Sequence, residues 1–313
     1  MQAAFRLLWV LVGSLLCFGL GLATVRGEEE TDRGQFVDVT LTVGRRTVRI
    51  YPAREPARAV ILFGSGDGGW SYFERRCCHH LADVGCLVIG IDCNRYATDA
   101  TYDLPQLAQD LATLSELGRQ KAAQPAAPVL WGGWSMGAEQ SVPAAAYWLE
   151  KDPAKAPRGL LLVAPGERGR FGLHTQDRLG VKPTGPGTYG LPDYAEKLKP
   201  LRVAQFHPSL DLLDHTAWLD RVTTEHQLWV LGKAVHNFAG VSPEFLAQVD
   251  DALNWLLAAP ESAAAPTQLY SQSWDRQLIG WTLGVILFLA GLIGWWIRRR
   301  RRKKATWPAP NVV

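Results

Sequence analysis

The residues Gly133-Trp134-Ser135-Met136-Gly137 form the pattern G-x-S-x-G between an apolar run and a stretch with helical periodicity. A serine at such a strand–turn–helix bend projects away from both elements, and the two glycines remove side chains that would clash there. Enzymes use a serine in this setting as a nucleophile that forms a covalent acyl intermediate. The pattern therefore predicts Ser135 as a catalytic nucleophile.

A nucleophilic serine needs a base, and the base needs an acid to hold it. In proteins whose nucleophilic serine lies at such a bend, the three catalytic residues follow one another in the sequence as serine, acid and histidine. His236 lies between the last apolar run and the last helical stretch, which is the expected place of the base. Asp211 and Asp214 follow the preceding run. We predict Asp211 as the acid because it is closer to the strand end, with Asp214 as the alternative and Glu167 as a third candidate.

A glycine-rich loop follows the first long apolar run. Gly64, Gly66 and Gly69 have the spacing G-x-G-x-x-G, and Asp92 ends the next run, which together approach a dinucleotide-binding fingerprint. Trp70 would obstruct a helix N-terminus that has to hold a pyrophosphate. We therefore disfavour a nicotinamide cofactor and expect no cofactor.

The alternative role of this loop is an oxyanion hole. One donor in such a hole is the N–H of the residue after the nucleophile, here Met136, and the other comes from the loop after the third strand. The N–H of Gly66 or Asp67 would be that second donor, because glycine lets the backbone approach a substrate carbonyl.

Six apolar runs alternate with helical stretches, after a hairpin that we predict at 36–53 with its turn at 44–46. The runs are continuous, as expected of strands buried on both faces. The pattern predicts an α/β-hydrolase fold, with a mostly parallel central sheet flanked by helices. The predicted strands are 59–63, 86–92, 128–134, 159–165, 202–206 and 226–232. The predicted helices are 73–84, 104–123, 138–152 and 242–259. The Gly- and Pro-rich stretch 166–200 is predicted to be an insertion over the carboxyl edge of the sheet.

Both ends of the chain read as targeting segments. Residues 1–27 combine Arg6, an apolar stretch and small residues, which is typical of a signal peptide, with an uncleaved anchor as the alternative. Residues 278–297 are uncharged and long enough to span a bilayer, and seven cations follow them. Because such cations favour the cytoplasm, we expect a single-pass cell-membrane protein whose catalytic domain is extracytoplasmic (periplasmic). The expected organisation is a signal peptide (1–27), a hydrolase domain (28–257), a linker (258–277), a transmembrane helix (278–297) and a basic cytoplasmic tail (298–313).

The charge of the chain is divided between its parts. The whole chain of 313 residues has a formal charge of +3. Without Arg6 and the seven tail cations, 25 basic residues remain against 30 acidic ones, so the exported part is near −5. This balance argues against a nucleic-acid partner. It leaves the membrane and a lipid ester as the expected partners, while protein partners are not indicated.

The exported domain carries Cys77, Cys78, Cys86 and Cys93. Disulfides are plausible in an exported domain, and the sequence does not assign their pairing. The run Cys-Cys-His-His at 77–80 lacks the C-x₂-C spacing of a zinc site, so no metal is expected.

Several of these motifs together resemble the VirJ/AcvB family of bacterial virulence proteins: "SGDGGW" (65–70), "VGCLVIGID", "DLPQLAQDL", "GWSMGAEQSVP" and "HNFAG". The resemblance runs from about residue 60 to 256. It implies an exported α/β hydrolase that acts on aminoacylated phosphatidylglycerol, notably the lysyl form. It also implies Ser135 as nucleophile, His236 as base and 65–70 as the oxyanion loop. The chain departs from the family pattern at Trp134, Met136 and Glu139.

These observations predict a membrane-tethered serine ester hydrolase. The alternatives are a general esterase or thioesterase of lipids or the cell envelope, and a non-catalytic scaffold for secretion or virulence.

Overall fold

A computed structural model describes residues 31–54, 56–98, 102–177, 181–211, 216–238 and 241–259. The chain divides into two compact units, Met1–Ala263 and Ala264–Val313, and the second lies outside the described residues. The predicted signal peptide, transmembrane helix and basic tail all lie outside the described residues. Within the described ranges, no helix has the length and apolar character needed to cross a membrane.

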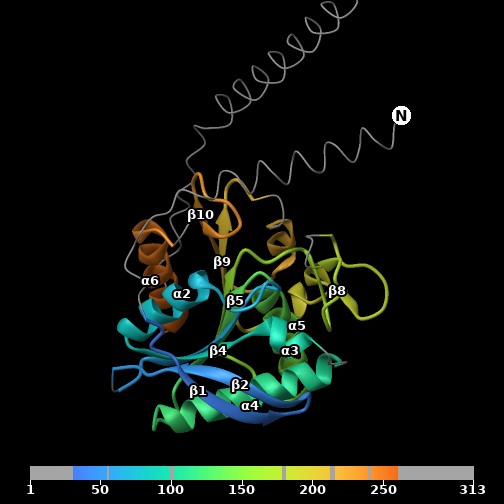
Figure 1. The fold of residues 1–313 in the computed structure, drawn as a ribbon. Coiled ribbons are helices and arrows are strands. Elements are labelled where there is room, and N and C mark those ends of the chain that lie inside the picture. The colour runs from blue at the N-terminus through green and yellow to red at the C-terminus, as the bar shows by residue number, and fades with distance from the viewer. Residues whose placement is uncertain are drawn as a thin grey trace, which may run out of the picture. The chain divides into compact units, whose positions relative to one another are not determined.

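An eight-stranded sheet forms the centre of the first unit, in the order β1-β2-β4-β3-β5-β6-β9-β10 (Figure 1). The hairpin β1–β2 is antiparallel and joins β4 in antiparallel fashion, and all further pairings are parallel. The strands are β1 Gln35–Leu41, β2 Gly44–Tyr51, β3 Ala59–Gly64, β4 Cys86–Ile91, β5 Val129–Trp134, β6 Gly159–Val163, β9 Arg202–Pro208 and β10 His226–Leu231. The parallel strands therefore end at one common edge.

Helices cover both faces of the sheet (Figure 1). They are α2 Tyr72–Asp83, α3 Cys93–Ala97, α4 Leu104–Lys121, α5 Met136–Lys151 and α6 Pro243–Leu257. Successive residues of β3 belong to different cores: Val60 and Leu62 pack with α4 and α5, whereas Ile61 and Phe63 pack with α2 and α6. All six residues of β3 are buried, which explains the continuous apolar run in the sequence.

The predicted strands and long helices are confirmed, with bounds shifted by a few residues at most. The predicted turn at 44–46 is wrong. The chain turns at Thr42 and Val43, and Gly44 begins β2 with a φ of +95°. The short helix α3 was not predicted, because five residues are too few to show helical periodicity.

The stretch 166–200 contains more regular structure than an insertion rich in Gly and Pro indicates. Its strands β7 Arg168–Arg170 and β8 Thr188–Gly190 form a small antiparallel sheet. Two 3₁₀ turns follow, at Leu191–Asp193 and Ala195–Leu198.

Candidate functional site

Ser135 occupies a sharp bend between β5 and α5. Its φ is +50°, a left-handed conformation that costs a non-glycine residue about 1–3 kcal/mol. Hydrogen bonds on both sides maintain the bend: the Ser135 N–H donates to the Val163 carbonyl (2.9 Å), and the Glu139 N–H donates to the Ser135 carbonyl (2.9 Å). The strained backbone is therefore held by the sheet and by the first turn of α5.

The glycines around Ser135 permit a close approach of backbones. A Cβ at Gly133 or at Gly137 would run into the backbone of Gly64, at the end of β3. The Gly137 N–H also donates to the Ser65 carbonyl (3.0 Å). The start of α5 is thus pinned against the loop that follows β3.

The predicted base and acid are hydrogen bonded to each other. His236 Nδ1 lies 2.6 Å from Asp211 Oδ2, and the Asp211 side chain is only 2% exposed. The two loops that carry them are tied together, because the Leu210 N–H donates to the Ala234 carbonyl (2.9 Å). With Nδ1 facing the carboxylate, Nε2 is the ring nitrogen left to exchange a proton.

The alternative acids have other places. Asp214 lies outside the described residues. Glu167 forms an ion pair with Lys182, with 2.8 Å between Oε2 and Nζ.

His236 lies beside the bend that carries the serine. The ring of Trp134, the residue before Ser135, has its centroid 5.2 Å from that of the imidazole. His236 also interacts electrostatically with the carboxylates of Asp67 and Glu139. The structure thus brings together segments that are a hundred residues apart in the chain.

The glycine-rich loop approaches the same bend. A Cβ added at Gly66 would lie 3.7 Å from Ser135 Cβ. The Gly66 N–H, however, already donates to Glu74 Oε1 (3.3 Å). Met136 is the first residue of α5, so its N–H has no acceptor within the helix. The Asp67 carboxylate likewise accepts a hydrogen bond from its own N–H. Of the three predicted oxyanion donors, Met136 is therefore the best placed to serve a substrate.

Glu74 anchors this loop from α2. Its side chain is fully buried, and burial raises its pKa. Oε2 accepts hydrogen bonds from the Ser71 N–H (2.8 Å) and the Ser71 hydroxyl (2.5 Å), which completes a capping box at the start of α2. Sequence reasoning missed Glu74, although Ser71 followed three residues later by a glutamate is a capping signature.

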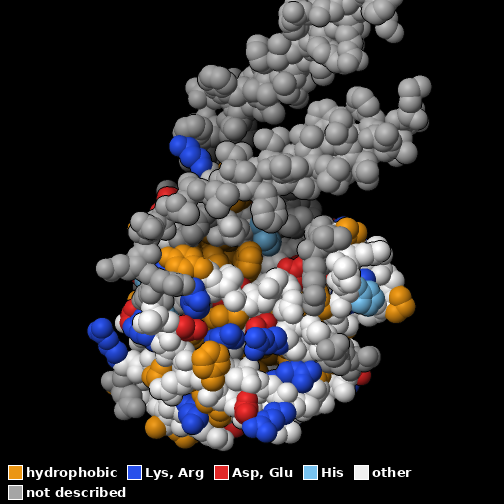
Figure 2. All heavy atoms as spheres, viewed as in Figure 1, with side chains coloured by type: hydrophobic (Ala, Val, Ile, Leu, Met, Phe, Trp, Pro, Cys, Tyr) orange, Lys and Arg blue, Asp and Glu red, His pale blue; other side chains and the backbone are white. Residues whose placement is uncertain are grey.

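Asp67 and Glu139 interact electrostatically with His236 and with a third carboxylate, that of Asp177. Burial raises the pKa of Glu139 to about 7, against a hydrogen bond from the Gly166 N–H (2.9 Å), and the carboxylates of Asp67 and Asp177 raise it further. Burial also raises the pKa of Asp67. Asp177 comes from the 166–200 insertion and forms an ion pair with Arg170 (3.0 Å). In Figure 2, a histidine and acidic side chains lie together on the upper part of the described surface.

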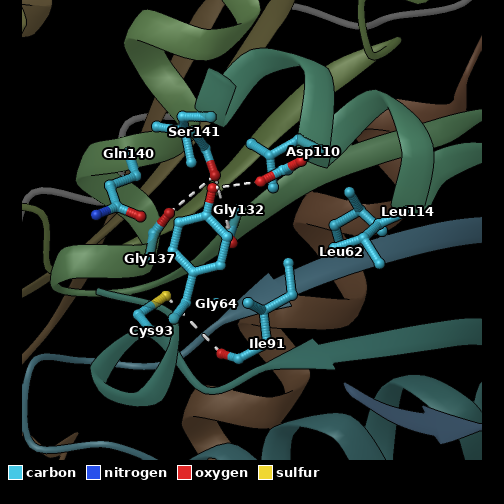
Figure 3. Close-up of a pocket in the computed structure, with 13 residues that line it drawn as sticks. Leu62, Gly64, Ile91, Cys93, Asp110, Leu114, Gly132, Gly137, Gln140 and Ser141 are labelled. Carbon is cyan, nitrogen blue, oxygen red and sulfur yellow. Dashed lines mark hydrogen bonds between the residues drawn. The ribbon is translucent and has the colours of Figure 1, made fainter. Parts of the chain in front are cut away.

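An internal cavity of about 20 Å³ lies behind this site, between the sheet and helices α4 and α5 (Figure 3). Asp110 faces it and accepts hydrogen bonds from the Tyr96 hydroxyl (2.8 Å) and from Thr42. The volume suits about one water molecule, so this cavity is too small for an ester substrate.

The four cysteines of the described domain are free and buried. The expectation of disulfides is therefore wrong for Cys77, Cys78, Cys86 and Cys93. Their neighbours in the Cys-Cys-His-His run have separate partners, since His80 Nε2 lies 2.7 Å from Asp250 Oδ1. Asp92, the acidic residue of the dinucleotide interpretation, caps α3 by accepting the Arg95 N–H (3.1 Å).

The sheet order, the flanking helices and the serine bend define an α/β-hydrolase fold. Residues 58–206 match the family model described as VirJ, a bacterial virulence protein. The resemblance predicted from the motifs is confirmed over that range. A comparison with curated proteins finds no match.

Solved structures support the fold assignment. DcsB in complex with its substrate analogue is 12% identical, with a TM-score of 0.52 over 72% of this chain and 98% of that chain. A putative dienelactone hydrolase from Klebsiella pneumoniae is 14% identical, with a TM-score of 0.52 over 72% and 97% of the two chains. An esterase from Pyrobaculum calidifontis is 15% identical, with a TM-score of 0.50 over 74% and 86%. At these identities the likeness establishes the fold.

Proposed function

We propose that the chain is a serine hydrolase that cleaves carboxylic esters. The observation that carries this proposal is the Ser135 bend beside a histidine whose Nδ1 lies 2.6 Å from a buried aspartate. Ser135 Oγ attacks the ester carbonyl while His236 Nε2 takes its proton. Asp211 keeps the ring oriented and stabilises the imidazolium that forms. The N–H of Met136, together with an N–H of the 65–70 loop, would stabilise the tetrahedral oxyanion.

The reaction is completed by water. The imidazolium returns its proton to the departing alcohol, which leaves an acyl group on Ser135. His236 then takes a proton from water, and the resulting hydroxide attacks the acyl carbonyl. Collapse of the second intermediate releases the carboxylic acid and restores the serine hydroxyl.

The substrate we propose is an aminoacyl ester of phosphatidylglycerol. The carboxylates of Asp67 and Glu139 interact electrostatically with His236. Because the pKa of Glu139 is raised to about 7, an ammonium group on the acyl part would meet the most negative charge near the reacting carbonyl above that pH. At about 4 Å, one such pair would attract by about 4 kcal/mol at an effective dielectric constant of 20, before desolvation is subtracted. The lipid ester is what the resemblance to the VirJ/AcvB family implies, and the VirJ match over 58–206 supports that resemblance.

The expected location fits a lipid substrate. The sequence predicts an exported domain joined by a linker to one membrane helix. A tether of this kind raises the effective concentration of a lipid ester near the domain. Export and tethering are proposed here on the sequence alone.

The test has two parts. A fluorophosphonate probe should label the wild type and not Ser135→Ala; equal labelling of both would refute the serine mechanism. The second part compares kcat/KM for lysyl-phosphatidylglycerol with kcat/KM for p-nitrophenyl acetate. Asp67→Asn and Glu139→Gln should each lower the ratio of the two about tenfold, while Glu116→Gln, on the exposed side of α4, should leave it unchanged.

A general esterase is the second candidate, favoured by the likeness to one solved structure that is described as an esterase. It would remain if p-nitrophenyl acetate is hydrolysed and the lysyl lipid is not.

A further inference from the structure

Trp134 is the last residue of β5 and immediately precedes the serine. Its indole Nε1–H donates to the carbonyl oxygen of His236 across 2.9 Å. The two rings lie 5.2 Å apart at an interplanar angle of 41°. One side chain therefore holds the backbone of His236 and also covers part of its imidazole.

The same indole contacts the loop that follows β3. A Cβ at Gly66 would lie 3.0 Å from Cε3 and Cζ3 of the Trp134 ring, so the loop backbone rests against the indole. On a further side, the Phe73 ring of α2 lies 5.1 Å away. Trp134 is thus in contact with the base and with the oxyanion loop, and it is bonded directly to the nucleophile.

We propose that Trp134 is a positioning residue, which sets the distance between the base, the oxyanion loop and Ser135. This inference rests on the proposed hydrolase function and adds a residue to it. Bulk packing alone does not account for these contacts, since Trp134 is half-buried and the only polar atom of its side chain is hydrogen bonded to the backbone of His236.

The base needs such support at its own backbone. Phe238, two residues further on, is buried against Phe245 with ring centroids 4.5 Å apart, which anchors the far side of the loop. The Trp134 bond is the contact that fixes His236 itself on the side of the bend. A shift of about 1 Å in a catalytic group can cost about a hundredfold in rate.

The indole ring contributes a second effect. When His236 takes the proton from Ser135, its ring becomes a cation whose centroid lies 5.2 Å from that of the indole. A neutral imidazole already packs favourably against the indole, and the charged form gains an additional electrostatic attraction to the ring. This attraction therefore favours the transition state more than the ground state, which raises kcat rather than lowering KM.

Trp148 offers a matched control on α5. Its Nε1–H also donates to a backbone carbonyl, that of Ala108 (2.7 Å), and its side chain is buried on the face of the sheet away from α2. Trp134→Phe and Trp148→Phe each keep an aromatic ring and remove one indole hydrogen bond. The two variants should melt at similar temperatures, so a difference in turnover reports position rather than stability.

The experiment measures hydrolysis of p-nitrophenyl acetate and the rate of fluorophosphonate labelling in the full-length chain. Trp134→Phe should lower kcat and the labelling rate about tenfold, with KM within about twofold of the wild type. Trp134→Leu, which lacks a ring, should lower kcat about a hundredfold. Trp148→Phe should stay within about twofold in both quantities. Trp134→Tyr takes the place of Trp134→Phe if the latter does not fold.

Three results would overturn the inference. These are an unchanged kcat in Trp134→Phe, an equal loss in Trp148→Phe, and a rise in KM at constant kcat, which would make Trp134 a substrate contact. A wild type that is neither labelled nor active is a separate outcome, because it removes the proposed function and the inference with it.

Discussion

Glu139→Gln tests the electrostatics of the site through the stability of the domain. The pKa of Glu139 is raised from its ordinary value of 4.5 to about 7, chiefly by burial. Between these two values the folded chain keeps a proton that the unfolded chain releases. The contribution of Glu139 to the free energy of unfolding is therefore most favourable below about pH 4.5, falls as the pH rises to about 7, and is constant above that.

The size of the effect follows from the shift. The rise of the Glu139 pKa from 4.5 in the unfolded chain to about 7 in the folded chain lowers the free energy of unfolding at pH 8 by about 3 kcal/mol. At pH 5 the loss is below about 1 kcal/mol, because the folded chain is still protonated there. Glutamine has the shape of the protonated acid, and its carbonyl can still accept the Gly166 N–H. Glu139→Gln should therefore be about 3 kcal/mol more stable than the wild type at pH 8, and less than about 1 kcal/mol more stable at pH 5.

Urea denaturation at the two pH values measures both differences, and Glu116→Gln serves as the control for a change of charge at the surface. A stability difference between Glu139→Gln and the wild type that is equal at pH 5 and pH 8 would refute the reasoning. So would a wild type that is the more stable protein at pH 8.

Three further predictions concern the framework of the site. Asp211→Asn should lower kcat by roughly three to four orders of magnitude, because the amide favours the wrong imidazole tautomer. The domain should stay folded by circular dichroism, with Ser135 still accessible to the fluorophosphonate probe. A kcat near that of the wild type would mean that another residue is the acid. Gly137→Ala should cost at least about 3 kcal/mol in urea denaturation, since its Cβ would overlap the Gly64 backbone; an unchanged midpoint would contradict this close approach. The four cysteines of α2, β4 and α3 should not react with Ellman's reagent in the folded domain, and the number that react in denaturant should be the same without reducing agent; a lower number would reveal a disulfide.

The order of the elements could be predicted because the buried strands leave a strong signal. β3, β4 and β6 are buried at every position, so their apolar runs do not depend on which face is counted. Helices α4 and α6 each begin at a capping side chain, Asp103 and Ser242. These local features are consistent with the tertiary packing, so the sequence alone was sufficient to predict the strands of the large sheet and the four long helices.

The nucleophile and its partners were predicted from their order in the chain. This order indicates which loop carries each residue, but it does not give the contacts that the side chain makes. The pairing of His236 with Asp211 needed the two loops to be placed side by side. The occupation of the Gly66 N–H by Glu74 depends on how α2 packs under the loop, and no spacing rule reveals it. Glu139 lies one helical turn after Ser135, and its raised pKa comes from burial and from the carboxylates of Asp67 and Asp177, which belong to two other segments.

The carboxylate of Glu74 belongs to a helix terminus and to the loop beside the nucleophile at once. Selection for thermal stability and selection for turnover would consequently act on the same few atoms, and a substitution of Glu74 would change both properties. A thermostabilised variant of this protein should therefore keep Glu74 and carry its stabilising substitutions on the opposite face of the sheet.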